Sequence, residues 1–276
     1  MNTFEGKNFH YDLGEKTYIM GILNVTADSF YDGGKWNSPL TAVKHAIVLE
    51  NDGADMIDVG AQSTRPGHIE LSEEEELTLI KQFFFRIVDE VTVPVSVDTF
   101  YPRVAEYCLK NGASVINDVS GKFSIEMAEI IKKYKAGWII MHTGGGTASK
   151  AVNYKNGIVN DVVSFFENMY NRCVEAELKP NQLCFDMGIG FGKSNSDNIE
   201  LIRNINKLKY KDVALLTALS NKRVVANALK VNGYDRIYGT IAADTAAISG
   251  GTDFIRVHEV KESKLAALMA DAIYRG

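Results

Sequence analysis

Residues 92–121, TVPVSVDTFYPRVAEYCLKNGASVINDVSG, contain one complete strand–helix–strand unit. The short apolar run 93–98 ends in Asp98, and a proline then opens an amphipathic segment over 102–111. A Gly-Ala pair follows, as is usual where a left-handed cap ends a helix and turns the chain back toward a sheet. The next apolar run, 114–118, again ends in polar residues. This pattern predicts parallel strands that are buried on both faces.

The same alternation extends over the whole chain. Strands are predicted at 18–25, 54–60, 93–98, 114–118, 137–142, 182–188, 213–219 and 254–258. Helices are predicted at 39–52, 72–89, 102–111, 125–134, 159–176, 196–206, 222–231, 240–249 and 262–274. Eight such units predict an α/β fold, a (β/α)8 TIM barrel that forms a single domain over 1–276. The segment before residue 18 is expected to form a short hairpin across the barrel floor.

Composition excludes several classes of protein. The 276 residues are enough for one large core, and a hydrophobic fraction of 46% is typical of a globular protein. A net charge of −5 without a basic stripe argues against a nucleic-acid partner. No apolar run approaches the ~20 residues of a membrane span, and the N-terminus has no signal core. Three cysteines without a CxxC pair predict buried free thiols and a cytoplasmic protein.

Polar residues stand at the downstream ends of nearly every predicted strand. Since the C-terminal ends of parallel barrel strands surround one mouth, these side chains are expected to share one pocket. They include Asn24, Asp98, Asn117, Asp186, Lys222, Arg256 and His258. This mixture of carboxylates, amides and cations suits a polar heterocycle that carries an anionic group.

Arg256 and His258 are two residues apart on the last strand, so both side chains point to the same face. An arginine fork and a histidine donor at the mouth predict a phosphate-type site, which such barrels often form near strands seven and eight. The alternative is a structural ion pair near the rim, for instance with Glu259.

Asp98, Asn117, Asp186 and Lys222 form a plausible set for recognising a heterocycle such as a pterin, whose ring edge carries both donors and acceptors. The alternative for Asp98 and Asn117 is that they cap the helices that follow them. Asn24 offers an amide oxygen that could ligate Mg²⁺ together with water and substrate phosphates.

The stretch 186–193, DMGIGFGK, matches neither a Walker A loop nor the GxGxxG spacing. Its glycines are expected to let the backbone approach a flat ligand, with Phe191 stacking on it; the alternative is a tight turn with Phe191 in the core. Long loops at 26–37, 61–71 and 143–158 are expected to close over the mouth. The acidic run 73–76 is expected to be a solvated helix start.

Several of these motifs together resemble one enzyme family. They are GILNVTADSFYDGG (21–34), DVGAQSTRPG (58–67), VSVDTF, INDVSG, FDMGIGFGK (185–193), Ser-x-Lys (220–222) and IRVH (255–258). In this order and spacing they resemble dihydropteroate synthase, from about residue 18 to the C-terminus. The resemblance implies a cytoplasmic, homodimeric, Mg²⁺-dependent transferase of folate synthesis, which joins 6-hydroxymethyl-7,8-dihydropterin pyrophosphate to p-aminobenzoate and releases pyrophosphate.

The resemblance also implies residue roles. The pterin would be held by Asp98, Asn117, Asp186 and Lys222. Pyrophosphate would be held by Asn24, Thr64, Arg256 and His258, with Asn24 on the metal. The p-aminobenzoate side would comprise Phe30, Thr64, Pro66, Phe191 and Arg223. The catalytic set would be Asp28, Arg65, Asp98, Asp186 and Lys222. The implied mechanism is dissociative, with the C–O bond to pyrophosphate breaking before the amine attacks.

The chain departs from the family pattern at Ala27, Gln62, Met187, Asn221 and Arg223. Arg223 stands where the family has a small hydroxyl residue near the p-aminobenzoate carboxylate, so it either pairs with that carboxylate or crowds the pocket. Weak sulfonamide binding is expected for the same reason. The alternative functions are a divergent paralogue that binds pterin pyrophosphate but uses another acceptor or is non-catalytic, and a methyltetrahydrofolate–corrinoid methyltransferase, which does not need the first loop or the Arg–His pair.

Overall fold

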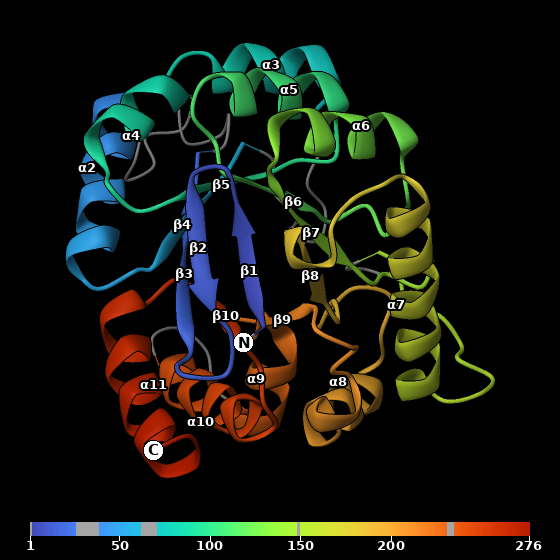
Figure 1. Cartoon of the computed structure of the whole chain (residues 1–276). Coiled ribbons are helices and arrows are strands. Elements are labelled where there is room, and N and C mark those ends of the chain that lie inside the picture. The colour runs from blue at the N-terminus through green and yellow to red at the C-terminus, as the bar shows by residue number, and fades with distance from the viewer. Residues whose placement is uncertain (1, 26–38, 62–70, 148–149, 231–234) are drawn as a thin grey trace.

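Eight parallel strands close into a barrel in the computed structural model, which describes residues 2–25, 39–61, 71–147, 150–230 and 235–276 (Figure 1). The strand order is β10-β3-β4-β5-β6-β7-β8-β9. The strands are β3 (Tyr18–Asn24), β4 (Met56–Gly60), β5 (Val95–Asp98), β6 (Val115–Asp118), β7 (Gly137–Met141), β8 (Leu183–Asp186), β9 (Ala214–Thr217) and β10 (Phe254–Val257). The predicted barrel is confirmed, and each predicted strand overlaps an observed one.

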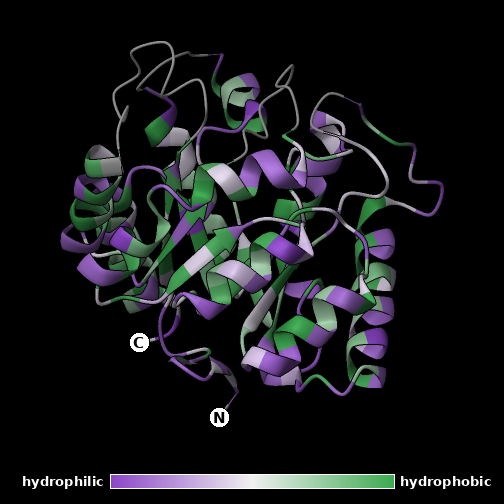
Figure 2. Ribbon diagram, turned by 90° about the horizontal axis from the view of Figure 1, so that it is seen from above, coloured by the Kyte–Doolittle hydropathy of each residue, from purple (hydrophilic) through white to green (hydrophobic). Residues whose placement is uncertain are grey.

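Helices form a ring outside the barrel (Figure 1). They are α2 (Pro39–Asn51), α3 (Glu73–Ile80), α4 (Phe84–Glu90), α5 (Pro102–Lys110), α6 (Ile125–Tyr134), α7 (Ile158–Glu175), α8 (Asn195–Arg203), α9 (Arg223–Leu229), α10 (Arg236–Ser249) and α11 (Val260–Tyr274). α5 illustrates their construction, because a proline begins it and Val104, Ala105, Cys108 and Leu109 form its buried stripe. Apolar residues accordingly concentrate in the strands, and polar residues in the outer faces of the helices (Figure 2).

The prediction of one helix over 72–89 is wrong, because the chain breaks it into α3 and α4. Phe83 lies between them with φ −135°, outside the helical range, and both Phe83 and Phe84 are fully buried. Neighbouring side chains of a continuous helix point about 100° apart. The local break lets both rings enter the core.

The acidic start of α3 was expected to be entirely solvated, and this is wrong for Glu76, which is buried. Ser72 and Glu75 form the capping box expected from their spacing, and Glu75 is exposed. Glu76 lies one residue further along α3, on the face that also buries Leu77 and Ile80. Consecutive glutamates thus lie on different faces of α3: Glu75 faces solvent, and Glu76 faces the core.

The N-terminal hairpin, β1 (Thr3–Gly6) and β2 (Phe9–Asp12), lies across one end of the barrel, as predicted (Figure 1). Its aromatic side chains pack on rings at the starts of β3 and β10, with centroid separations of 4.6–5.6 Å. The cluster comprises Phe4, Phe9, Tyr11, Tyr18 and Phe254. The hairpin thus seals the floor with a dry aromatic layer.

Above this floor, alternate residues of each strand point into the barrel. The lower inward layer is apolar and includes Met20, Met56, Val115, Ile139, Cys184, Ala214 and Leu216. A period of two then places the next inward positions at the strand ends, where the polar residues occur. The three cysteines are buried free thiols, as predicted. No helix among the described residues is long and apolar enough to cross a membrane.

Candidate active site

A layer of polar side chains lies directly above the filling of the barrel. Each member lies two residues beyond an inward residue, which is apolar except for Ser96 on β5. Its members are Asp58 on β4, Asp98 on β5, Asn117 on β6, Asp186 on β8 and Arg256 on β10. The C-terminal ends of these strands form the mouth, so the layer lies at the base of the mouth.

Arg256 lies at the centre of this layer and bridges two carboxylates. Its Nε donates to Asp58 Oδ2 at 2.7 Å, and its Nη2 donates to Asp98 Oδ2 at 3.0 Å. Asn117 Nδ2 donates to the same Asp58 oxygen at 3.0 Å. A guanidinium has five N–H groups, and these bonds use two of them, so the group keeps donors for an anion. The Arg256 fork therefore links β10 to β4 and β5, and Asn117 adds β6 through Asp58.

The helix-cap alternative is wrong, whereas the ion-pair alternative holds for Arg256 with other partners than Glu259. The helix α5 has Tyr101 as its N-cap and α6 has Ser124, so neither Asp98 nor Asn117 caps a helix. Arg256 pairs with the two aspartates and not with Glu259, which instead accepts hydrogen bonds from Ser220 and Asn221.

Asp58 ends a predicted strand and belongs to this layer, although the site prediction gave it no role. It is completely buried, and its Oδ1 has no hydrogen-bond partner among the described residues. A buried carboxylate oxygen without a partner carries a desolvation cost that a ligand N–H could offset. The period of two from the inward-facing Met56 is the signal that could have identified it.

Burial raises the pKa of Asp98 to about 7, against the opposing attraction of Arg256. The negative charge of Asp58 also raises this pKa, because two carboxylates share one guanidinium. A ligand that donates N–H groups to these carboxylates would favour their ionised forms.

Asp186 and Lys222 form the opposite side of the pocket. Asp186 Oδ1 accepts a 2.7 Å hydrogen bond from the Gly188 amide, and burial raises the pKa of the carboxyl although Lys222 opposes the shift. Burial lowers the pKa of Lys222 to about 8, and Asp186 opposes that change. Lys222 Nζ donates to the Ile189 carbonyl and lies 4.9 Å from the centre of the Phe191 ring.

The glycine loop after β8 packs tightly on the chain that follows β7. Gly188, Gly190 and Gly192 all have positive φ, between 64° and 86°. A Cβ on Gly188 would lie 1.9 Å from the His142 carbonyl oxygen, so glycine is required there. Phe191 is half-buried rather than part of the core, which leaves its ring at the pocket beside Lys222.

His258 stands one inward position above Arg256 and is oriented by Ser220. Ser220 Oγ lies 2.9 Å from His258 Nδ1 and accepts a 3.2 Å bond from the His258 amide. Ser220 Oγ also donates to Glu259 Oε2 at 3.2 Å. These contacts orient the His258 ring at the mouth.

Asn24 ends β3 and pairs in register with Gly60 on β4. A Cβ on Gly60 would lie 3.5 Å from Asn24 Oδ1, so the absent side chain leaves room beside the amide oxygen. Within the described ranges, no three His, Cys, Asp or Glu side chains are arranged to hold a metal ion. A site built on one amide oxygen fits Mg²⁺, which keeps several waters and uses substrate phosphates as ligands.

Comparison with known proteins agrees with this architecture. The family model for pterin binding enzymes matches residues 20–258. A dihydropteroate synthase from Clostridium beijerinckii is 39% identical over 267 residues, which cover 96% of this chain and 97% of the relative. The chain belongs to the dihydropteroate synthase family.

Two solved members of the family share the fold closely. The dihydropteroate synthase from Clostridium difficile, solved in the presence of pteroic acid, has a TM-score of 0.90 and 40% identity, over 96% of this chain and 100% of that chain. The Xanthomonas albilineans enzyme with 4-aminobenzoic acid has a TM-score of 0.86 and 33% identity, over 94% of this chain and 93% of that chain. The family assignment thus rests on sequence and fold together.

Five of the residues implied by the dihydropteroate synthase pattern lie outside the described residues. They are Asp28, Phe30, Thr64, Arg65 and Pro66, in the loops after β3 and β4. Arg223, the main departure from the family pattern, is described: it is the first residue of α9 and is exposed. Its exposure favours a contact at the rim over crowding of the site.

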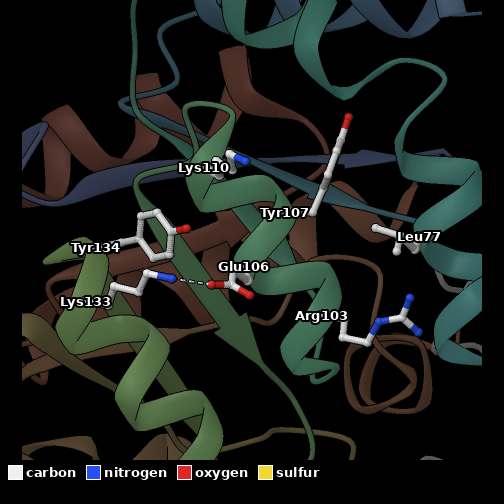
Figure 3. Close-up of a pocket in the computed structure, with 7 residues that line it drawn as sticks. All are labelled: Leu77, Arg103, Glu106, Tyr107, Lys110, Lys133 and Tyr134. Carbon is white, nitrogen blue, oxygen red and sulfur yellow. Dashed lines mark hydrogen bonds and ion pairs between the residues drawn. The ribbon is translucent and has the colours of Figure 1, made fainter.

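A second hollow, of about 500 Å³, lies outside the barrel between α3, α5 and α6 (Figure 3). Arg103 and the Lys133–Glu106 ion pair line it, together with tyrosines. It contains none of the dihydropteroate synthase motif residues and no buried titratable group, so the chemistry belongs to the mouth.

Replacing Asp98 with asparagine is expected to flatten the pH dependence of stability of the ligand-free protein. The pKa of Asp98 is about 7 in the folded state and about 4 in an unfolded chain. A raised pKa contributes stability that is fully present below the unfolded value and is lost as pH rises through the folded value. The wild-type free energy of unfolding should therefore fall between about pH 4 and pH 7, by up to about 1.4 kcal/mol per pH unit.

Urea denaturation across that pH range measures this effect. The matched control is Asp89→Asn on α4, since Asp89 is exposed. The control should keep the wild-type slope. An Asp98→Asn variant with the same slope as wild type would show that Asp98 is ionised throughout.

Proposed function

We propose that the strand-end residues at the barrel mouth divide the family reaction among them. The reaction condenses 6-hydroxymethyl-7,8-dihydropterin pyrophosphate with p-aminobenzoate, giving 7,8-dihydropteroate and pyrophosphate in folate biosynthesis. The observation that carries the proposal is the inward layer in which Arg256 joins Asp58 and Asp98 beside Asn117. It places carboxylates for ring N–H groups next to a cation for the leaving group.

Asp98, Asn117, Asp186 and Lys222 would hold the pterin. Buried carboxylates accept the ring N–H and amino groups, Asn117 donates and accepts, and Lys222 donates to a ring carbonyl or nitrogen. The raised pKa of Asp186 reflects desolvation that N–H donors of the ligand would offset. Recognition thus comes from polar groups that are already ordered before the ligand arrives.

Arg256, His258 and Asn24 would bind the pyrophosphate. The bond between the pterin methylene carbon and the pyrophosphate oxygen breaks first, and its electron pair leaves with pyrophosphate. Arg256 and His258 stabilise the growing negative charge with N–H donors that the protein holds in place. Mg²⁺ bound at Asn24 would supply further charge neutralisation.

The methylene cation that remains is delocalised into the pterin ring. Asp98 and Asp186 lie beside the pterin site on β5 and β8, and their negative charge favours this cation. The amine of p-aminobenzoate then forms the new C–N bond and loses a proton. Asp28 and Arg65, from the loops after β3 and β4, would close over the site and exclude water.

Pyrophosphate release from the pterin substrate with Mg²⁺, measured with and without p-aminobenzoate, tests the proposal. Release that depends on the acceptor and yields dihydropteroate is the expected result. Tight binding of pterin pyrophosphate without acceptor-dependent release would instead favour a paralogue that uses another acceptor.

We propose that Arg223 binds the carboxylate of the acceptor, with Phe30, Thr64, Pro66 and Phe191 framing its ring. Arg223→Ser is therefore expected to raise the KM for p-aminobenzoate about tenfold, with little change in the KM for pterin pyrophosphate. Arg236→Ser at the start of α10 is the control for loss of an arginine nearby. An unchanged KM would exclude the contact.

Weak sulfonamide binding stays a prediction, and a micromolar inhibition constant for sulfamethoxazole would contradict it.

We propose that the protein is a homodimer that pairs through α11 and the adjoining part of α10. Four apolar side chains on the outer face of α11 are 55–63% exposed, at helical spacing: Leu265, Leu268, Met269 and Ile273. An exposed stripe of this kind is typical of an interface. Leu268→Glu combined with Met269→Glu is expected to halve the mass seen by light scattering, whereas Val48→Glu on α2, also exposed, should not. A wild-type monomer would contradict the proposal.

A further inference from the structure

Lys193, at the end of the glycine loop, is a buried lysine to which the reaction assigns no role. Its residue is 8% exposed, and its Nζ donates to three backbone carbonyls. The acceptors are His142 O at 3.0 Å, Gly188 O at 2.9 Å and Phe191 O at 2.9 Å. All three donor positions of the ammonium are therefore used to hold backbone.

These carbonyls belong to two different strand-end loops. His142 follows β7, whereas Gly188 and Phe191 belong to the loop after β8. The same two loops meet again at Gly192, whose carbonyl accepts from the Val152 amide at 2.8 Å and from Tyr154 Oη at 2.9 Å. The loop after β7 and the glycine loop thus form one clamped unit.

The clamped unit carries the two groups that contact Lys222. Ile189, directly after Gly188, accepts a hydrogen bond from Lys222 Nζ through its carbonyl. Phe191 places its ring 4.9 Å from the same nitrogen. Lys193 Nζ donates hydrogen bonds to the carbonyls of Gly188 and Phe191, which lie on either side of Ile189 in the chain. Any shift of this loop would move both contacts of Lys222.

We propose that Lys193 is a positioning residue, which fixes the glycine loop so that Ile189 and Phe191 hold Lys222 in place for the pterin. The inference rests on the proposed role of Lys222 in pterin binding. A lysine suits this role because one ammonium reaches three carbonyls that converge from different directions, which no apolar side chain could satisfy.

Burial of Lys193 removes its ammonium group from water, which disfavours the charged form. Burial lowers its pKa to about 7, against the attraction of Asp186. The three hydrogen bonds to backbone carbonyls offset part of this desolvation and fix the glycine loop beside Lys222.

Binding of pterin pyrophosphate without acceptor, measured by titration calorimetry, tests the proposal. Lys193→Met keeps the length of the side chain but removes the donors, and its Kd is expected to be at least about tenfold weaker than that of wild type. Lys133→Met is the matched control, since Lys133 forms an exposed ion pair with Glu106 on the outer helices, and its Kd should be unchanged.

A double-mutant cycle separates positioning from general support of the fold. If Lys193 acts through the Phe191 ring, the effect of Lys193→Met on Kd should shrink in a Phe191→Leu background. The proposal would be overturned if the fold-change in Kd of the double variant equals the product of the two single fold-changes. A folded Lys193→Met protein with wild-type Kd would overturn it as well. Failure of the wild type itself to bind would instead contradict the proposed function.

Tyr154→Phe provides a milder variant in case Lys193→Met does not fold. It removes one donor to Gly192 and leaves the Val152 amide in place. A Kd about two- to fivefold weaker, at unchanged secondary structure, is expected. A wild-type Kd for this variant would show that clamping of the loop does not affect the pterin site.

Discussion

Lys222→Met should lower kcat/KM for pterin pyrophosphate by about a thousandfold. The substitution removes the cation that acts most strongly on Asp186 and the ammonium that lies 4.9 Å from the Phe191 ring centre, while it nearly keeps the side-chain volume. In a desolvated pocket such a donor acts at low dielectric, so its loss is large. The remaining buried carboxylate would also repel electron-rich parts of the ligand.

Steady-state kinetics with both substrates measures this effect. Lys230→Met is the matched control, because Lys230 caps the other end of α9 and is exposed. The control should keep wild-type kinetics. A Lys222→Met enzyme within about tenfold of wild type would mean that Lys222 does not bind the pterin in the transition state.

Arg256→Lys should lower kcat/KM by about a hundredfold or more, although it keeps the charge. The guanidinium reaches Asp58 with Nε and Asp98 with Nη2, on two different strands, and still has donors for pyrophosphate. A lysine ammonium is a single point charge that cannot span both carboxylates and an anion. One aspartate would lose its partner, and breaking a buried pair costs about 3–5 kcal/mol of stability.

Kinetics and urea denaturation of the variant test both parts. Arg203→Lys, at the exposed last turn of α8, is the control and should change neither. Adding Asp58→Asn to Arg256→Lys should cost less stability than the two separate changes together, because the charges share one network. Full additivity would show that the 2.7 Å contact contributes little in solution.

The barrel could be predicted from the sequence because each strand and helix is marked by residues close together in the chain. Each unit has its own apolar run, polar end and helix start, and the predicted strands differ from the observed ones mostly by a residue or two at their ends. The convergence of Asp98, Asn117 and Arg256 also followed, since parallel strands share one mouth.

Pairings across the barrel could not be predicted in the same way. Asp58 and Arg256 are 198 positions apart, and their contact depends on β10 closing the barrel against β3. The three hydrogen bonds of Lys193 Nζ likewise depend on how the loops after β7 and β8 pack on each other. Glu76 was misjudged because its burial is set by the side of α3 that faces the barrel, not by its acidic neighbours.

The aromatic hairpin closes the floor of the barrel, beneath the apolar side chains that fill its interior. Phe4 and Phe9 are buried beneath the strands, so no ligand can pass through that end. Both substrates must enter, and both products must leave, through the mouth. The substrate that binds second therefore lies between the first substrate and solvent. We expect the two products to leave in a fixed order, which product-inhibition patterns would show.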